Sequence, residues 1–304
     1  MSDWSVSEPD LESIFKRHAS PLDALAAGDV PALVLRQAFS PAACERLVAK
    51  LIDQQLLFDP HQPIPEKFAE AAIPEGYFRE GGQGEAAKVW QNASVSDRTR
   101  IDIGSSLGYR GSNPDEFFSH AEESRLLFGT LFGGGENPVD LLYESLTALS
   151  NGKQAVTAYE PDGRRYGPAI IRAHYGGYEY APHFDSVRLR EKRMGFSVYE
   201  FEHQFAGVVV LQNTQLDDRV AQTILHRCLW EPHVDPHLRN GTFHEYARTH
   251  GIENTEVVLD PGDLYFFNTR GIHEVPGVAG TLPRIVLATF IGYSADRDEM
   301  FVWS

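Results

Sequence analysis

The chain has 304 residues, of which 42% are hydrophobic and 11% aromatic, a composition that excludes a mainly disordered or fibrous protein. Its 27 Lys and Arg residues against 43 Asp and Glu residues give a formal net charge of −16. Because binding to a phosphate backbone relies on basic side chains, no nucleic-acid partner is expected. No apolar run approaches the roughly 20 residues that cross a bilayer, so no membrane insertion is expected either.

The cysteines and the N-terminus both predict a cytoplasmic protein. Cys44 and Cys228 are the two cysteines, and they stand far apart in no CxxC pair, so neither a disulfide framework nor a zinc knuckle is expected. The first 18 residues are polar and acidic and lack the basic start and apolar stretch of a signal peptide.

The N-terminal half is predicted to be mainly helical. Residues 31 to 39 indicate a short strand, after which Ser40-Pro41 supplies a cap and a first helical position. Further helices are predicted over residues 113 to 132 and 137 to 152. From residue 59 to 111, Gly, Pro and charged residues follow no regular period, which predicts long loops. The apolar face expected for the helix after Asn113 contains Phe117, Leu126, Leu127 and Leu131.

After residue 153 short strands separated by Gly, Pro and Asp predominate. The predicted strands cover residues 169 to 175, 205 to 212, 256 to 259, 264 to 268, 273 to 275 and 284 to 293. Strands of this kind following a helical half predict an α+β protein, with a sandwich or jelly-roll barrel faced by helices.

One pair of residues in the strand-rich half has the spacing of metal ligands. His183 and Asp185 stand two positions apart at the end of a predicted strand, so both side chains point to one face of the backbone. His273 follows 88 residues after Asp185, at the start of another strand. Two His and one carboxylate can occupy one face of an octahedral ion and leave three positions open, as in non-haem Fe(II) oxygenases.

An H-x-D pattern alone is common by chance, so the metal site is predicted mainly from His273 and from the residues that follow it. Arg284 lies eleven residues beyond His273 in the strand-like run RIVLATFIGY. Its planar guanidinium suits a carboxylate ligand, although an ion pair at the sheet edge is the alternative. Five other histidines, between residues 226 and 250, match no common metal motif and are expected in loops or at the surface.

Two longer segments resemble the prolyl-4-hydroxylase superfamily of 2-oxoglutarate, Fe(II)-dependent dioxygenases. They are RAHYGGYEYAPHFD, which contains the H-x-D pair, and LDPGDLYFFNTRGIHEVPGVAGTLPRIVLATFIGYS. The resemblance spans about residues 168 to 295 and implies a double-stranded β-helix core over residues 153 to 304, with residues 1 to 152 packed outside it in one integrated domain. It further implies Fe(II) bound by His183, Asp185 and His273, and 2-oxoglutarate held by Arg284, with O2 as the oxidant.

A weaker and longer similarity connects the chain with the carrier-independent aliphatic halogenases of indole-alkaloid biosynthesis. It rests on PAIIR before the metal motif, the spacing to the distal His, and the ending FIGYSADRDEMFVWS. Those halogenases carry Gly in place of Asp185, which leaves a coordination position for chloride. The carboxylate of Asp185 therefore implies hydroxylation, on an unactivated carbon of a small molecule such as an amino acid derivative or a natural product.

Several residues are candidates for contacts with the co-substrate or the substrate. His174 stands where the superfamily usually has Tyr, and it either contacts 2-oxoglutarate or packs beside the barrel. Residues 186 to 204 are long enough to form a lid. In that lid, Arg188 and Arg193 either meet an anionic substrate or lie on a solvated face. Tyr180 is a further substrate candidate, and the aromatic rings Phe78 and Trp90 line an apolar pocket or belong to the core.

Two alternatives to hydroxylation remain open. The same site can give halogenation, desaturation or epoxidation, of which Asp185 argues only against the first. The other alternative is a non-catalytic metal-binding jelly roll that senses or stores a ligand. The sequence indicates neither the oligomeric state nor the identity of the substrate.

Overall fold

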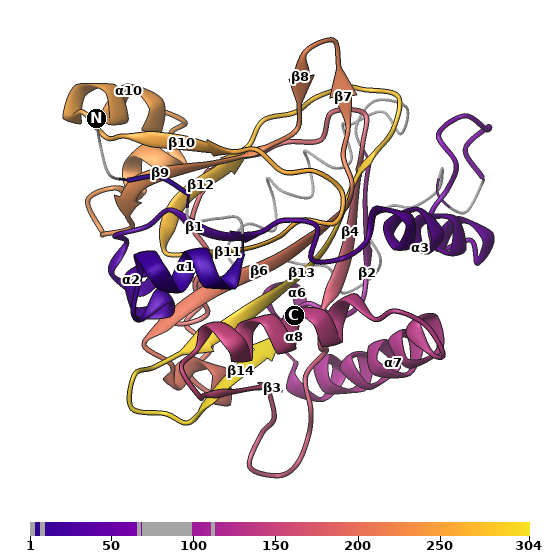
Figure 1. The fold of residues 1–304 in the computed structure, drawn as a ribbon, viewed down its shortest axis with the longest axis horizontal. Coiled ribbons are helices and arrows are strands. Elements are labelled where there is room, and N and C mark those ends of the chain that lie inside the picture. The colour runs from indigo at the N-terminus through magenta and orange to yellow at the C-terminus, as the bar shows by residue number, and fades with distance from the viewer. Residues whose placement is uncertain (1–3, 7–9, 66–67, 69–98, 111–112) are drawn as a thin grey trace.

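The computed structural model describes residues 4–6, 10–65, 68, 99–110 and 113–304, and element labels follow Figure 1. Phe78 and Trp90 lie outside the described residues. The main helices of the N-terminal half are α1 (Leu11–Arg17), α2 (Pro21–Ala27), α3 (Pro41–Asp53), α6 (Leu107–Arg110), α7 (Pro114–Phe132) and α8 (Pro138–Leu149).

Three of these helices begin in the same way. In α3, α7 and α8 the first residue is Pro, which has no backbone N–H to leave unpaired. The preceding side chains of Ser40, Asn113 and Asn137 accept hydrogen bonds from backbone N–H groups of the first turn. The helix starts predicted from the sequence are therefore correct.

The larger of the two main sheets has eight strands: β1 (Ala32–Leu35), β2 (Thr99–Ile103), β3 (Gln154–Thr157), β4 (Ile170–Tyr175), β6 (His203–Gln212), β11 (Leu264–Asn268), β13 (Arg284–Tyr293) and β14 (Glu299–Trp303). Its order is β1-β11-β6-β13-β14-β3. The long strand β13 pairs along one side with β6, and on its other side first with β4 and then with β14. Strand β2 extends the sheet beyond β4.

The smaller sheet has the order β10-β9-β12-β5. Its strands are β5 (Tyr180–His183), β9 (Thr223–Leu229), β10 (Asn254–Val257) and β12 (Gly271–Val275). Helices α9 (Asp235–Arg239) and α10 (Phe243–His250) accompany it, and Phe243 and Ala247 of α10 pack with Ile272 of β12. A short hairpin, β7 (Gln215–Leu216) with β8 (Arg219–Val220), and the 3-10 helix η1 (Ser197–Glu200) complete the described elements.

The alternation of side chains along β6 and β13 divides the core into two layers. Val209 and Leu287 belong to an apolar cluster on one face of the large sheet that also contains residues of the helices α1, α2, α3, α7 and α8. Their neighbours Val208 and Val286 pack on the other face, together with Leu225 of the small sheet. Successive residues of a strand point to opposite faces, and here successive residues are apolar. Both faces of the large sheet are therefore apolar. Figure 1 shows α7 and α8 on the side of the molecule away from β9, β10 and α10.

The structure corrects the sequence predictions at several elements. Strands β2, β3, β9 and β14 and the short strands β7 and β8 were not predicted, and β2 lies within a region expected to be loop. Leu126 of α7 is 68% exposed, because it stands nine residues from the buried Phe117, about half a turn around a helix axis. Apart from the parallel pair β3 and β14, the strands pair antiparallel, and this mixture of helices and mainly antiparallel sheets agrees with the predicted α+β class.

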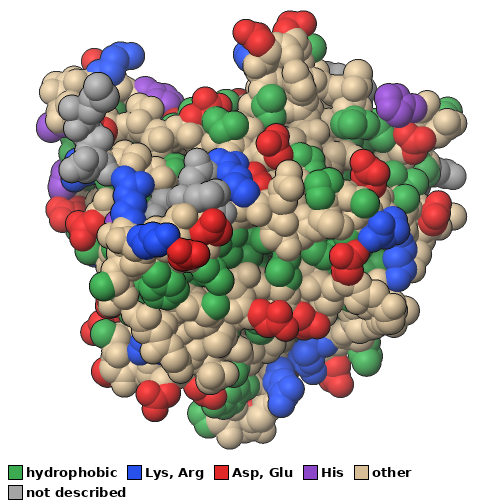
Figure 2. Space-filling view, viewed as in Figure 1, with side chains coloured by type: hydrophobic (Ala, Val, Ile, Leu, Met, Phe, Trp, Pro, Cys, Tyr) green, Lys and Arg blue, Asp and Glu red, His purple; other side chains and the backbone are tan. Residues whose placement is uncertain are grey.

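The surface carries charges of both signs. On the face shown in Figure 2, Lys and Arg side chains form small separate groups among acidic side chains. Of the helices in the described part of the chain, none is long and apolar enough to span a bilayer.

Candidate metal centre

The pairing of two strands brings the predicted metal ligands together. His183 at the end of β5 and His273 in β12 are Cα partners in the antiparallel small sheet. Partners in register project to the same face, and the centroids of the two imidazole rings are 4.2 Å apart. Asp185 follows β5, where its backbone N–H donates to the carbonyl of Thr269 (2.9 Å) and its own carbonyl accepts from the Thr269 hydroxyl (2.8 Å).

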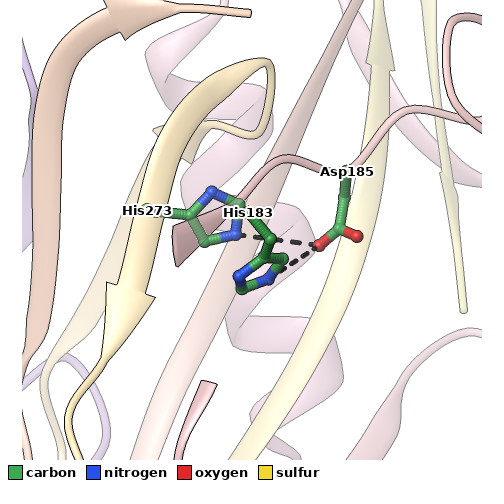
Figure 3. A group of neighbouring side chains, drawn as sticks. All are labelled: His183, Asp185 and His273. Carbon is green, nitrogen blue, oxygen red and sulfur yellow. Dashed lines mark ion pairs between the residues drawn. The ribbon is translucent and has the colours of Figure 1, made fainter. Parts of the chain in front are cut away.

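The three side chains converge on one point. Oδ2 of Asp185 lies 3.7 Å from Nε2 of His183 and 3.7 Å from Nε2 of His273 (Figure 3). Within the described residues, this is the one group of three or more His, Cys, Asp or Glu side chains with ligand atoms all within 4.8 Å of one another. A single divalent ion between these three atoms would contact one oxygen and two nitrogens.

Backbone carbonyl groups set the tautomer of both histidines. Nδ1 of His183 lies 2.8 Å from the carbonyl oxygen of Ala181, and Nδ1 of His273 lies 2.9 Å from that of Gly271. Because a carbonyl can only accept, each Nδ1 carries the hydrogen and each Nε2 presents its lone pair to the centre. Burial and the neighbouring His273 lower the pKa of His183 to about 3, so this imidazole is neutral at physiological pH.

Asp185 is the ionised member of the group. Burial raises the pKa of its carboxyl group, but the interactions with His273, His183 and Arg190 together outweigh burial and hold this pKa well below its usual value. Nη1 of Arg190 donates to Oδ1 of Asp185 at 3.0 Å. Two imidazoles whose Nε2 atoms face the centre and one carboxylate form the donor set that suits a non-haem Fe(II) ion with open coordination positions.

A cavity lies between the two sheets beside this cluster, and we call it the inter-sheet cavity. Side chains of both sheets line it, among them Arg172, His174, Tyr180, Thr223, Tyr265, Val275 and Arg284. The three metal-ligand candidates line it as well. Arg284 is 5% exposed, and among the described residues its guanidinium has no hydrogen-bonding or ionic partner. An unpaired buried cation is costly, so this group is suited to an anionic ligand in the cavity.

His174 contributes a neutral imidazole to the same cavity. Its Nε2 lies 3.1 Å from the hydroxyl of Tyr180, and its ring is 4% exposed. Burial, followed by the charges of Arg284 and other guanidinium groups, lowers its pKa well below the usual value. When the Tyr180 hydroxyl donates to Nε2, the remaining N–H is at Nδ1.

The sequence did not single out a group of charged residues on β2 and β4. The Arg100 guanidinium donates through Nε to Oδ1 of Asp102 at 2.8 Å, and both side chains are 5% exposed. The Arg172 guanidinium lies 3.9 Å from the same carboxylate. Arg100 was not recognised because β2 lies in a region predicted to be loop, and the pairing of β2 with β4 is a long-range contact.

The structure separates the two arginines predicted to meet a substrate. Arg188 borders a second cavity of about 400 Å³, together with Trp230 and Arg270. Arg193 is 8% exposed, and its Nε lies 3.8 Å from a carboxylate oxygen of Glu191. Neither of them is among the residues that line the inter-sheet cavity, whereas Tyr180 is.

One of the five histidines between residues 226 and 250 is buried, contrary to expectation. His226 on β9 is 5% exposed, and its Nε2 lies 2.8 Å from Oε1 of Glu274. Its position was missed because β9 itself was not predicted.

The fold and the family have matches among known proteins. Residues 8–304 match the model of the family described as carrier-protein-independent halogenase WelO5. Among solved structures, the chain is similar to an N-substituted L-amino acid dioxygenase from Burkholderia ambifaria AMMD in complex with α-ketoglutarate, at 15% identity and a TM-score of 0.54, covering 94% of this chain and 91% of that one. A second structure of that dioxygenase gives 16% identity and a TM-score of 0.50, with the same coverage. No match was found among curated proteins.

Fold and site together define an enzyme of the 2-oxoglutarate- and Fe(II)-dependent oxygenase class, with Fe(II) and 2-oxoglutarate as its cofactors. Within that class, the chain belongs to the family of the carrier-protein-independent halogenase WelO5, whose model matches almost its entire length. Both resemblances found in the sequence are thereby confirmed.

Proposed function

We propose that this enzyme hydroxylates an unactivated carbon of a small molecule. The observation that carries the proposal is the carboxylate of Asp185, whose Oδ2 lies 3.7 Å from each imidazole Nε2. That carboxylate would occupy the coordination position through which a halogenase of this kind binds halide. With the position taken, an oxygen-derived group is the one available for transfer to carbon.

Each residue of the site has a distinct task in this proposal. His183, Asp185 and His273 would hold Fe(II), while Arg284 would bind the far carboxylate of 2-oxoglutarate by an ion pair with two hydrogen bonds. His174 would add a third hydrogen bond from Nδ1. Fe(II) and 2-oxoglutarate, when bound, supply the oxidation chemistry with O2. The chain itself orients the reactants and excludes water from the inter-sheet cavity.

The arrangement of the two main sheets suggests a fold within the α+β class. We take the two main sheets to be the halves of a double-stranded β-helix, or jelly roll, with its centre at the inter-sheet cavity. The apolar cluster shared by both sheets supports this arrangement. We also take the chain to be one integrated domain, because β1 pairs with β11 and β2 pairs with β4 across the boundary near residue 153.

The proposed substrate is an amino acid derivative or a natural product. The Burkholderia dioxygenase with a similar fold is named for N-substituted L-amino acids. Tyr180, which lines the inter-sheet cavity, would contact such a substrate. Arg188, beside the second cavity, remains a candidate for an anionic group, whereas the burial of Arg193 favours a structural role. Residues 186 to 204 would form the lid, pinned by a hydrogen bond from Val187 N–H to Oε1 of Gln204.

Halogenation is the second candidate, because the family to which the chain belongs is named for it. Desaturation and epoxidation would use the same residues, and a non-catalytic sensor would bind metal without turnover. These outcomes differ in what is consumed and in what the product contains.

The test is succinate formation from 2-oxoglutarate by protein loaded with iron under anaerobic conditions and then exposed to air. The reaction is run with a panel of small molecules, with and without chloride, and His183→Ala is the control. Succinate that depends on His183 and rises with one panel member, together with a product heavier by one oxygen atom, supports hydroxylation. A chlorinated product supports the second candidate, and iron binding without succinate under any condition supports the sensor.

A further inference from the structure

The two carboxylate oxygens of Asp185 have different surroundings. Oδ2 faces the Nε2 atoms of His183 and His273, each at 3.7 Å. Oδ1 accepts a hydrogen bond of 3.0 Å from Nη1 of Arg190. In Figure 3 one oxygen of Asp185 is directed at both imidazoles, and the other is directed away from them.

Arg190 is held in place by contacts other than the one to Asp185. Its Nη1 also donates to the carbonyl oxygen of Phe184 at 2.6 Å, and its guanidinium carbon lies 5.8 Å from the centroid of the Phe184 ring. Its backbone N–H donates to the carbonyl of Ser186 at 3.1 Å, which closes a turn directly after the metal motif. The side chain is 30% exposed, so the cation keeps part of its hydration while it meets the carboxylate. These contacts place the guanidinium independently of any metal ion.

The contact to Oδ1 limits how Asp185 can bind a metal ion. Carboxylates coordinate metal ions through one oxygen or through two. In an octahedral ion, two imidazoles and one oxygen leave three positions, whereas a carboxylate that binds through both oxygens leaves two. A 2-oxo acid needs two positions to chelate the ion, and O2 needs a third. A guanidinium on Oδ1 therefore preserves the number of open positions that an oxygenase requires.

We propose that Arg190 is a positioning residue that holds Oδ1 of Asp185 and so restricts this carboxylate to a single bond with the metal ion. The proposal rests on the proposed function, because it requires a metal ion at His183, Asp185 and His273. In this role Arg190 controls how Asp185 coordinates the metal ion. It neither captures the metal ion nor binds the substrate. This role also separates Arg190 from two neighbouring basic residues: Arg188 borders the second cavity, and Nε of Arg193 lies 3.8 Å from a carboxylate oxygen of Glu191.

Cobalt(II) provides a test that does not depend on turnover, because its visible absorption changes with coordination number. The metal-free protein is titrated with Co(II) and then with 2-oxoglutarate, as wild type and as Arg190→Met, Arg190→Lys, Lys192→Met and His183→Ala. Lys192→Met removes an exposed positive charge from the same segment and is the matched control. If Arg190→Met does not fold, Arg190→Gln, which is also neutral, takes its place.

We expect Arg190→Met to bind Co(II) with an altered absorption spectrum before any 2-oxoglutarate is added. We expect its affinity for 2-oxoglutarate to fall about tenfold or more, since changes of residues behind a metal ligand commonly have effects of 10- to 100-fold. Arg190→Lys, which keeps a charged donor, should restore much of both properties. Lys192→Met should match the wild type.

An Arg190→Met protein with the spectrum and 2-oxoglutarate affinity of Lys192→Met would overturn the proposal. So would a folded Arg190→Met protein that no longer binds Co(II), because Arg190 would then serve metal capture. The His183→Ala protein separates this failure from failure of the proposed function. If the wild type binds Co(II) no better than His183→Ala, the metal centre itself is wrong; if it binds better and Arg190→Met is unchanged, only the role of Arg190 is wrong.

Discussion

Arg284 and His174 are Cα partners on the neighbouring antiparallel strands β13 and β4. Their side chains therefore leave the large sheet on the same face and both line the inter-sheet cavity. Val286 and Arg172, each two positions from one of these residues along its strand, line the same cavity. The cation proposed to hold the far carboxylate of 2-oxoglutarate thus has a neutral imidazole beside it, at a distance set by the spacing of the strands.

The Arg284→Met variant should bind 2-oxoglutarate much more weakly. Loss of a bidentate ion pair in a buried site costs about 3 kcal/mol, or roughly a 100-fold increase in Kd. Titration of the Co(II)-loaded protein with 2-oxoglutarate measures this change. Arg239→Met, in which the replaced side chain is 79% exposed, is the control and should leave the Kd unchanged. An unaltered Kd in Arg284→Met would place the carboxylate anchor elsewhere.

The His174→Phe variant distinguishes a co-substrate contact from simple packing. A single lost hydrogen bond should raise the Kd for 2-oxoglutarate about tenfold, which corresponds to ~1.4 kcal/mol. The same titration checks it, alongside Tyr180→Phe, which removes the hydroxyl that fixes the tautomer of His174. If His174→Phe binds 2-oxoglutarate as the wild type does, His174 merely packs beside the cavity.

The Asp185→Gly variant should lose hydroxylation, because one of three metal ligands is gone. The vacated position would then be open to halide, and the positive charge of Arg190 would remain close to it. Product mass measured with and without added chloride or bromide checks both parts. Full hydroxylase activity in Asp185→Gly would rule out the assignment of the three ligands.

The metal-free protein should lose stability as the pH falls below the pKa that His183 has in the unfolded chain. The pKa of His183 is about 3 in the folded protein, whereas unfolded His has a pKa of about 6.5. The unfolded state therefore binds the extra proton first, and the contribution of His183 is complete above pH ~6.5 and declines toward pH ~3. The contribution of His183 to the free energy of unfolding should fall by about 1 kcal/mol between roughly pH 7 and 5.5.

Urea denaturation at the two pH values measures this loss, with His183→Asn as the comparison. The variant has no titrating group at this position and should show a smaller decrease with pH. An equal decrease in both proteins would show that the pKa of His183 is not lowered in the folded state.

The Glu160→Gln variant should loosen the proposed lid around Ser197. The buried carboxylate of Glu160 accepts hydrogen bonds from the Tyr166 hydroxyl, from the backbone N–H of Ser197 (3.0 Å) and from the Ser197 hydroxyl (2.7 Å). A neutral amide with only one acceptor oxygen cannot accept all three bonds equally well. We expect amide hydrogen exchange near Ser197 to accelerate, by about tenfold for each ~1.4 kcal/mol lost. Unchanged exchange near Ser197, with β6 as the internal reference, would mean that other contacts hold the segment.

The sequence was informative wherever structure depends on near neighbours. Ser40-Pro41 predicted the start of α3, because a cap and a proline act within one turn of helix. The apolar spacing that ends in Leu149 predicted α8, whose residues Val139, Leu142 and Leu146 are buried. By contrast, β9 and β14 lack a plain alternation of apolar and polar residues, and their pairing partners are distant in sequence.

For the site, the sequence by itself was enough to name the three candidate ligands, since the residue types and spacing of His183, Asp185 and His273 predict a metal site. The tertiary structure decided how these side chains meet, through the pairing of β5 with β12. It also distinguished Arg190 from Arg188 and Arg193, which the sequence treats alike. The reason is physical: the turn that closes on Ser186 determines which of these basic side chains reaches Asp185, and no local periodicity records that choice.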